Sequence, residues 1–390
     1  MVDQDTATRI LKTCQEEESW FLDLLEQLVK IETPPHEPHS HRTLFEQIQS
    51  VLTDLNFTSS VYPGDTSGGQ LYARPSPPQA GGYQLMLGHI DTVWPAGTLE
   101  SMPFARNGNV ITGPGIYDMK AGVTMMLTAL KVLKELGIDP PLQPILFINS
   151  DEETGSTDSK KRITWLARVV HRVFVLEPSM GRDGRIKTRR KGVGHFVLRV
   201  TGKSSHAGLE PEKGRSAILE LSYLIQQLFQ LNDPEHGITV NVGKVDGGIR
   251  TNVVAPESSA DVDVRVLNKK DARKIEEAIK NLSPSTPEVS VDISGGFGRE
   301  PMTQNERNRR LWHTAKAHGR LLGMELKQAT SGGASDGNLT SQHAATLDGL
   351  GAVGEGAHSP DEKIFLEETV RRTALLALLL LTPDPEKFTG

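Results

Sequence analysis

The chain has 390 residues, of which 37% are hydrophobic and 24% are charged, and its formal net charge is −6. This length exceeds what one hydrophobic core usually supports, so we expect two domains. The slightly acidic balance gives no reason to expect nucleic acid as a partner. A single cysteine, Cys14, excludes an intrachain disulfide bond and a cysteine-based zinc site.

Two stretches bear on export and membranes. The first residues, 1–5, lack the basic start and the apolar core of a signal peptide, so we expect a cytoplasmic protein. The longest apolar run, 374–381, is much shorter than the roughly 20 residues that a membrane span needs. It is predicted to be a buried terminal helix, and no membrane partner is expected.

Two amphipathic helices are predicted near the N-terminus, over 20–31 and 44–55. The segment between them holds three histidines, His36, His39 and His41, among prolines and a serine. Clustered histidines can bind a metal ion, but nothing around these three predicts burial. A solvated loop is the favoured interpretation.

From residue 83 onward, short apolar strands alternate with helices. Strands are predicted over 83–87, 145–148 and 173–176, and helices over 119–136 and about 159–170. Such an alternation predicts parallel strands joined by right-handed crossovers, and therefore an α/β domain with a mainly parallel sheet.

Chemically active side chains follow each of these strands. His89 follows the first strand, Glu152 and Glu153 follow the second, and Glu177 follows the third. The carboxyl ends of parallel strands share one edge of the sheet, where open α/β sheets bind their ligands. A solvated turn would explain any one of these acids, but an imidazole and several carboxylates at one edge indicate a site. Asp118 is expected there too, at the first turn of the long helix, where the helix dipole keeps a carboxylate ionised.

The middle of the chain predicts a second domain. Its pattern is strand, helix, strand, strand, helix, strand, over 194–200, 216–231, 238–245, 260–266, 271–282 and 289–293. This order is the ferredoxin-like layout. We therefore expect a first domain over 1–190 that is interrupted by an inserted domain over 191–304 and resumes over 305–390. The basic run 187–191 is interpreted as a solvated linker.

The candidate ligands favour a catalytic metal site. Carboxylates and imidazoles without thiolates suit zinc, manganese or cobalt. Five side chains exceed what one open catalytic ion needs, so two ions sharing a carboxylate are expected; the five are His89, Asp118, Glu153, Glu177 and His358. Asp91, two residues after His89, is expected to accept the other imidazole N–H.

These residues also carry a family resemblance. The segments concerned are His89-Ile-Asp91, Gly115-Ile-Tyr-Asp118-Met-Lys-Ala-Gly122, Asp151-Glu-Glu-Thr-Gly155, Glu177-Pro-Ser and His358-Ser-Pro. Together they resemble the M20 family of di-zinc metallopeptidases, which includes glutamate carboxypeptidase, acetylornithine deacetylase and succinyl-diaminopimelate desuccinylase. The resemblance extends over essentially the whole chain.

The resemblance implies how the ligands are shared. One Zn²⁺ would be held by His89 and Glu177 and the other by Glu153 and His358, with Asp118 bridging and Co²⁺ or Mn²⁺ as possible substitutes. Glu152, beside a ligand, is then left to act as the general base. The resemblance also implies a cis peptide bond after Asp118.

The resemblance further implies that the inserted domain forms a homodimer. His206, in Ser205-His-Ala-Gly208, would enter the partner's active site and stabilise the oxyanion, although a surface histidine is the simpler interpretation. Asn252 and Arg265 match substrate-binding positions. The Arg265 guanidinium would grip the free carboxylate of the substrate, or else be a solvated edge residue.

Two further assignments have plain alternatives. The backbone N–H groups of Gly332 and Gly333 would form an anion-binding nest, or belong to a flexible loop. Arg185 would contact the side-chain carboxylate of a leaving glutamate, as a basic residue does in glutamate-releasing relatives, or be a solvated loop charge.

The predicted function is hydrolysis of the amide bond of N-acyl amino acids or peptides that have a free C-terminal carboxylate. The segments around Asp118 and Glu177 are most similar to the glutamate carboxypeptidase branch. The alternatives are an acetylornithine deacetylase-like enzyme, an N-carbamoyl amino-acid amidohydrolase, and an inactive metal-binding homologue. The sequence leaves the acyl group, the leaving amino acid and the physiological metal open.

Overall fold

A computed structural model describes residues 2–35, 37–78 and 81–383. The chain divides into two compact units. The first unit comprises the described residues up to Thr188, then Gln304–Thr330, and those from Ser335 onward. The inserted unit comprises Arg189–Thr303 together with Ser331–Ala334.

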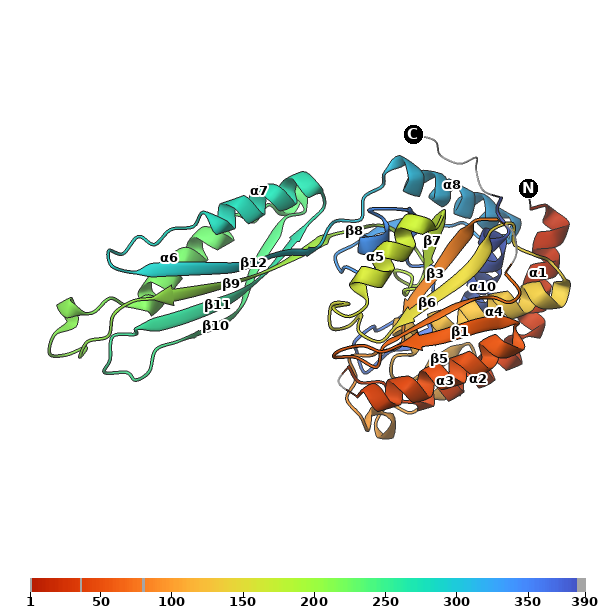
Figure 1. Cartoon of the computed structure of the whole chain (residues 1–390), viewed down its shortest axis with the longest axis horizontal. Coiled ribbons are helices and arrows are strands. Elements are labelled where there is room, and N and C mark those ends of the chain that lie inside the picture. Colours follow the sequence, from red (N-terminus) through yellow and green to blue (C-terminus); the bar gives the residue numbers. More distant parts are fainter. Residues whose placement is uncertain (1, 36, 79–80, 384–390) are drawn as a thin grey trace. The chain divides into compact units, whose positions relative to one another are not determined.

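The first unit contains helices and strands from both ends of the chain (Figure 1). Its helices are α1 (Gln4–Glu16), α2 (Glu18–Lys30), α3 (Pro38–Asp54), α4 (Ala121–Leu136), α5 (Lys160–Val169), α8 (Glu306–Leu321), α9 (Gly337–Thr340) and α10 (Leu366–Leu380). Its main sheet consists of β1 (Phe57–Tyr62), β2 (Gln70–Pro75), β3 (Tyr83–His89), β6 (Gln143–Asn149), β7 (Arg172–Val175) and β14 (Ala345–Leu347). A small second sheet consists of β4 (Ala105–Asn107), β5 (Val110–Thr112), β15 (Gly354–Glu355) and β16 (Lys363–Phe365).

The main sheet has the strand order β1-β2-β6-β3-β7-β14. Strands β6, β3, β7 and β14 run parallel to one another, whereas β1 and β2 are antiparallel additions at one edge. The mainly parallel sheet predicted from the alternation of strands and helices is therefore confirmed.

Helices pack on both faces of this sheet, and the strand residues alternate between two cores. Met86, Leu146 and Phe174 belong to a core shared with α1, α2, α3, α4 and α10. Their neighbours Leu85 and Phe147 point to a smaller core shared with α5 and α9. Burial on both faces explains why these strands read as continuous apolar runs instead of alternating patterns.

The inserted unit is a four-stranded antiparallel sheet with two helices. Its elements are β9 (Gly192–Thr201), α6 (Ala217–Phe229), β10 (Thr239–Gly247), β11 (Glu257–Val266), α7 (Lys269–Lys280) and β12 (Ser290–Arg299). The strand order β10-β11-β9-β12, with each neighbouring pair antiparallel, is that of a ferredoxin-like sheet. Its own core lies between the sheet and the two helices.

One expectation for the residues next to the inserted unit was wrong. The basic run 187–191 is not a solvated linker, because residues 187–190 lie in strand β8 (Ile186–Arg190), which pairs with β13 (Gln328–Ser331). Arg190 is buried and donates to the carbonyl oxygens of Gly333 (3.1 Å) and Ala334 (3.3 Å). These bonds connect the Ser331–Ala334 segment to Arg190, which belongs to the inserted unit as well.

The expected histidine loop also differs. Helix α3 begins at Pro38, so His39 and His41 are helical, and His36 lies outside the described residues. His41 is completely buried, and its Nδ1 accepts the N–H of Gly68 at 3.2 Å. Burial lowers the pKa of His41, so the ring is a neutral core group instead of a solvated one.

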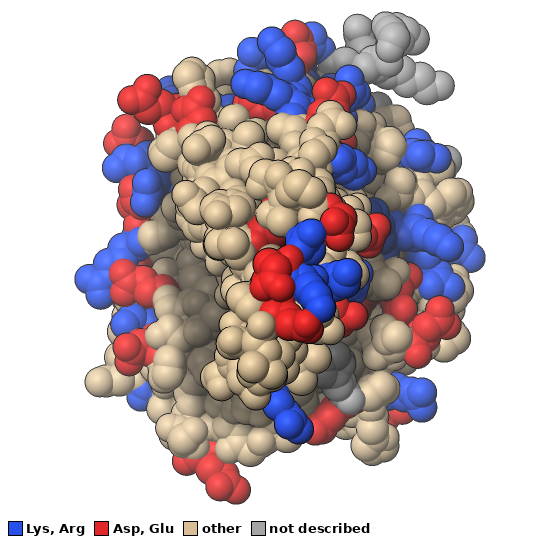
Figure 2. Space-filling model, turned by 90° about the vertical axis from the view of Figure 1, so that its left-hand side faces the viewer, with Lys and Arg blue, Asp and Glu red and all other residues tan. Residues whose placement is uncertain are grey.

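Two surface properties follow from the described residues. None of the helices among them is both long enough and apolar enough to cross a lipid bilayer. On the face drawn in Figure 2, acidic and basic side chains are interspersed between broad areas that carry neither charge.

Candidate metal centre

Separate segments of the first unit deliver the six side chains predicted to carry the chemistry. His89 is the last residue of β3, and Glu152 and Glu153 lie in the turn after β6. Glu177 follows β7 by two residues, and His358 lies between β15 and β16. Asp118 differs slightly from expectation, because it lies in an irregular turn, Ile116–Lys120, just before α4 begins.

Asp118 lies between the two histidines. His89 Nε2 is 3.2 Å from Asp118 Oδ1, and His358 Nε2 is 3.5 Å from Asp118 Oδ2. Each imidazole therefore approaches a different oxygen of the same carboxylate. The peptide bond between Asp118 and Met119 is cis.

Each histidine also has an acidic neighbour of its own. His89 Nε2 is 3.5 Å from Glu177 Oε1, and His358 Nε2 is 3.2 Å from Glu153 Oε1. The ligand atoms of His89, Asp118 and Glu153 lie within 4.8 Å of one another, and so do those of His89, Glu152 and Glu177. The structure thus brings all six residues into one cluster.

In this cluster, burial and the neighbouring charges shift the pKa values of the side chains in opposite directions. Burial lowers the pKa of His89, but hydrogen bonds with Asp118, Asp91 and Glu177 outweigh burial and raise it well above the ordinary value. Hydrogen bonds with Asp118 and Glu153 raise the pKa of His358 to about 10. Burial alone raises the pKa of Asp118, yet the two histidines lower it well below its usual range. The carboxylates therefore favour positive charge at this position.

Asp91 lies directly behind the cluster and is completely buried. Its backbone carbonyl is 2.9 Å from His89 Nδ1, which is nearer than its carboxylate Oδ1 at 3.4 Å. The carboxylate accepts the backbone N–H groups of Glu152 (3.2 Å) and Glu153 (2.8 Å). Asp91 thus orients the imidazole and also holds the acidic turn.

A second set of buried groups fixes the acidic turn from its other end. Asp151 Oδ2 accepts the N–H groups of Asp158 (2.7 Å) and Ser159 (3.1 Å). Asp336 accepts hydrogen bonds from Asn149 Nδ2 (2.6 Å) and Ser156 Oγ (2.5 Å). The first acid of the Asp-Glu-Glu run is therefore a structural group, whereas Glu152 and Glu153 point to the cluster.

Sequence reasoning missed Glu362, which is buried beside the cluster and accepts the backbone N–H of Asp118. It also missed Lys187, whose Nζ is 4.0 Å from Glu177 Oε2. The sequence contains one indication of Glu362, namely its position four residues after His358 in the same short segment. Because its neighbours are mostly polar, the local pattern predicts a solvent-exposed carboxylate instead.

The other predicted site residues, apart from Arg185, belong to the inserted unit. His206 is exposed, and its Nδ1 accepts the N–H groups of Gly208 and Leu209, both at 3.2 Å. The N–H of Ala207 donates to the carbonyl of Asn252 at 3.0 Å. The His206 and Asn252 segments, far apart in the sequence, are therefore side by side.

Arg265 and the two glycines also lie together. The Arg265 guanidinium binds Asp263 through two hydrogen bonds (2.9 and 3.1 Å) and donates to the Gly332 carbonyl at 3.1 Å. The Gly333 N–H donates to Ser331 Oγ at 3.2 Å. In this structure that N–H is therefore already used by the loop itself.

Arg185, in the first unit, is half-exposed and engaged locally. Its Nε donates to Asp183 Oδ1 at 3.0 Å and lies 3.4 Å from the Met180 carbonyl. These contacts match a loop charge with a local partner, and they leave its predicted role toward substrate as a proposal.

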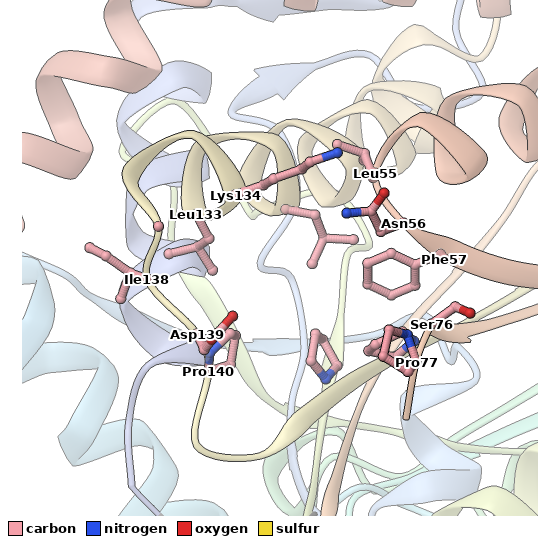
Figure 3. A pocket seen from close by; sticks show the side chains of 14 residues that line it. Leu55, Asn56, Phe57, Ser76, Pro77, Leu133, Lys134, Ile138, Asp139 and Pro140 are labelled. Carbon is pink, nitrogen blue, oxygen red and sulfur yellow. The ribbon is translucent and has the colours of Figure 1, made fainter. Parts of the chain in front are cut away.

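A separate cavity of about 280 Å³ lies elsewhere in the first unit (Figure 3). It is bounded by the ends of α3 and α4 and by Pro144, near the start of β6, opposite the end that carries the acids. Apolar side chains dominate its lining, including Leu55, Phe57, Leu133, Ile138 and Pro140. None of the predicted site residues lines this cavity.

Comparison with known proteins agrees with this geometry. The chain is 28% identical over 388 residues to carboxypeptidase G2 of Pseudomonas sp. (strain RS-16), covering 95% of this chain and 91% of that protein. It is 26% identical over 385 residues to acetylornithine deacetylase of Pasteurella multocida, covering 92% and 97%. Aminopeptidase PepT of Bacillus cereus shares the fold, with a TM-score of 0.77 at 22% identity, covering 93% of this chain and 98% of that one.

The model of peptidase family M20/M25/M40 matches residues 85–382, which include all five predicted ligands and both chain segments of the inserted unit. The chain therefore belongs to peptidase family M20/M25/M40.

Proposed function

We propose that this protein is a two-metal hydrolase of the carboxypeptidase type, which releases an amino acid with a free carboxylate from an N-acyl amino acid or a peptide. The observation that carries the proposal is the position of Asp118, whose two oxygens face two different imidazoles. That arrangement is the one expected of a carboxylate shared between two cations.

The donor set fits divalent cations. His89 and Glu177 would hold one cation and His358 and Glu153 the other, with Asp118 shared. All five donors are imidazole nitrogens or carboxylate oxygens, which suits zinc first and cobalt or manganese as alternatives. Burial of several acids so close together is unfavourable unless cations compensate their charge.

The chemistry divides between the cations and the chain. When bound, two cations would activate a water molecule and polarise the scissile carbonyl. Glu152 would take a proton from the attacking water and deliver it to the amide nitrogen of the leaving amino acid. Its carboxylate fits this role because it lies within 4.8 Å of the ligand atoms of His89 and Glu177. This placement also argues against an inactive homologue, which has no need of such a base.

The inserted unit would supply recognition of the substrate. Arg265, with Asn252 and the Gly332–Gly333 loop, would bind the free carboxylate, and His206 would stabilise the oxyanion of a partner subunit. A homodimer is supported by apolar side chains exposed on α6, on β10 and just after β10, namely Ile218, Leu219, Tyr223, Phe229, Val245 and Ile249. An exposed group of this kind is typical of protein interfaces.

The test is a panel of N-acyl amino acids and dipeptides incubated with the zinc-loaded protein. We expect release of a free amino acid, loss of this activity after chelation, and its return when Zn²⁺ or Co²⁺ is added. Activity that is insensitive to a chelator, or no hydrolysis of any amide with a free carboxylate, would refute the proposal. Preference for glutamate that falls in Arg185→Ala would support the proposed contact with the leaving side chain.

A deacylase of small N-acyl amino acids is the second candidate, with an N-carbamoyl amino-acid amidohydrolase beside it. The deacylase is favoured by the alignment with the Pasteurella multocida acetylornithine deacetylase, which extends over nearly all of both chains. The same panel separates the candidates, because a deacylase prefers acetyl or carbamoyl substrates over large acyl groups and peptides.

A further inference from the structure

Glu362 is a buried carboxylate, 1% exposed, that accepts four hydrogen bonds beside the candidate metal centre. Its Oε1 accepts the backbone N–H groups of Tyr117 (2.8 Å) and Asp118 (3.0 Å). Its Oε2 accepts the N–H of Gly115 (2.9 Å) and the indole N–H of Trp94 (2.8 Å). Both oxygens are therefore fully used. Two of the four donors belong to the Ile116–Lys120 turn that carries Asp118, and a third belongs to Gly115, directly before it.

That turn needs an acceptor from elsewhere in the chain. Gly115 has a left-handed φ of +68°, and Asp118 and Met119 have non-helical backbone angles. The usual helical acceptors are consequently missing for the N–H groups of Gly115, Tyr117 and Asp118. Buried N–H groups require acceptors, and Glu362 supplies one for each of these three. Its carboxylate thereby determines the path of the turn.

The same carboxylate connects three segments that carry predicted ligands. Glu362 follows His358 by four residues, and the turn between them is closed by hydrogen bonds from Ser359 to Gly356 and from Glu362 to Ser359, both 2.9 Å. Trp94 follows His89 by five residues. Glu362 therefore links the His358 segment to the Asp118 turn and to the segment after His89.

We propose that Glu362 is a positioning residue that holds Asp118 between the two imidazoles and so sets the affinity of the centre for divalent cations. It acts through the backbone of the Asp118 turn. The inference rests on the proposed function, since it assumes that Asp118 is a shared metal ligand.

The test measures metal affinity directly. Metal-free wild-type protein and Glu362→Gln are titrated with Zn²⁺ in competition with a chromophoric chelator, and the visible absorption spectrum of the Co²⁺ form is recorded. The amide retains the shape of the side chain but presents an NH₂ group to two of the N–H donors. We expect a loss of Zn²⁺ affinity of about 10–100-fold and a changed Co²⁺ spectrum.

Glu220 in the inserted unit provides a matched control. It is also a completely buried glutamate that accepts backbone N–H groups, from Ser285 (2.7 Å) and Thr286 (2.8 Å). Glu220→Gln should lower thermal stability but leave Zn²⁺ affinity and the Co²⁺ spectrum unchanged. This contrast separates positioning of a ligand from general support of the fold.

Each outcome decides the matter. Unchanged Zn²⁺ affinity in Glu362→Gln, or an equal loss in Glu220→Gln, overturns the positioning role. Wild-type protein that binds no Zn²⁺ refutes the proposed function instead, so the two failures are distinguishable. If Glu362→Gln does not fold, Glu362→Asp is used, because it retains the charge but is one methylene shorter. It too should bind Zn²⁺ more weakly than wild type, and wild-type affinity there overturns the inference.

Discussion

The candidate metal centre and the predicted substrate-binding residues differ in how completely one unit assembles them. Five segments of the first unit bring carboxylates and imidazoles to within 3.2–3.5 Å of one another around Asp118. In the inserted unit, by contrast, His206 and Asn252 are exposed and their segments lie side by side at the surface. Catalysis and recognition therefore make different demands on the fold. A metal centre must be preorganised within one rigid core, whereas surface residues acquire a function only when a second molecule is present.

The largest effect on kcat is expected for Glu152, the proposed general base in the first unit. Glu152→Ala should lower kcat at least about 100-fold while leaving the number of bound metal ions unchanged, because Glu152 is proposed to move protons and not to hold a cation. The neighbouring variant Glu153→Ala should lose both metal and activity. Steady-state kinetics and metal analysis check this pair. If Glu152→Ala keeps more than a few per cent of kcat, its role as the base is wrong.

The next effect tests whether the inserted unit acts on a partner. His206→Ala should lower kcat about 100-fold with little change in KM, since an oxyanion donor acts mainly in the transition state. Mixing His206→Ala with Glu152→Ala should restore activity, because one site of each mixed dimer then has both residues intact. The exposed histidine His236, also in the inserted unit, provides the control, and His236→Ala should behave as wild type. Mixtures that stay inactive would rule out action in trans.

A weaker effect is expected at the exposed apolar side chains of α6. Leu219 is 50% exposed and Phe229 is 49% exposed, so an aspartate at either position should raise the dimer dissociation constant by about 30-fold. Sedimentation velocity would measure the shift to monomer, and kcat should fall with it. Trp165→Asp changes a side chain that is 62% exposed on α5 of the first unit and should leave the dimer intact. If Trp165→Asp weakened the dimer as much as an aspartate at Leu219 or Phe229, that result would argue against this interface.

The smallest effect concerns the pH dependence of stability in the first unit. Burial and the nearby charge of Arg172 lower the pKa of His318, in α8, from 6.5 to about 4. The unfolded chain therefore binds the additional proton between pH 6.5 and about 4, and the folded protein loses stability as the pH falls through that window. His318→Asn has no imidazole to bind this proton. When the pH is lowered from roughly 7.5 to 5, the free energy of unfolding of wild type should therefore fall by about 1–2 kcal/mol more than that of the variant. Denaturant titrations at the two pH values measure this difference, and a parallel fall in both proteins would contradict it.

Much of the first unit could be predicted because its signals are local. Apolar runs followed by acids or a histidine predicted the strands and the edge of the sheet that carries His89, Glu153 and Glu177. The position of His358 required the family resemblance, since it reaches the cluster from the far end of the chain. Helix α1 was not predicted, although Ala7, Ile10 and Cys14 repeat at helical spacing, because most of its other residues are polar.

Other features could not be predicted from the sequence, because they depend on contacts with residues that are distant along the chain. Glu362 lies in a polar run that indicates exposure, and only the folded Asp118 turn gives its carboxylate four donors. His41 sits beside prolines that suggest a loop, yet α3 begins at Pro38 and buries the ring against Gly68. In both cases a long-range hydrogen bond offsets the desolvation of a polar group, and no local pattern records it.

Asp118 is proposed to be shared by two cations in the first unit. Anomalous X-ray scattering from crystals of the zinc-loaded protein tests this sharing most directly. We expect two zinc peaks, one among His89, Glu177 and Asp118 and the other among His358, Glu153 and Asp118. Zinc peaks only outside this cluster, or none in crystals of an active zinc-loaded protein, would contradict it.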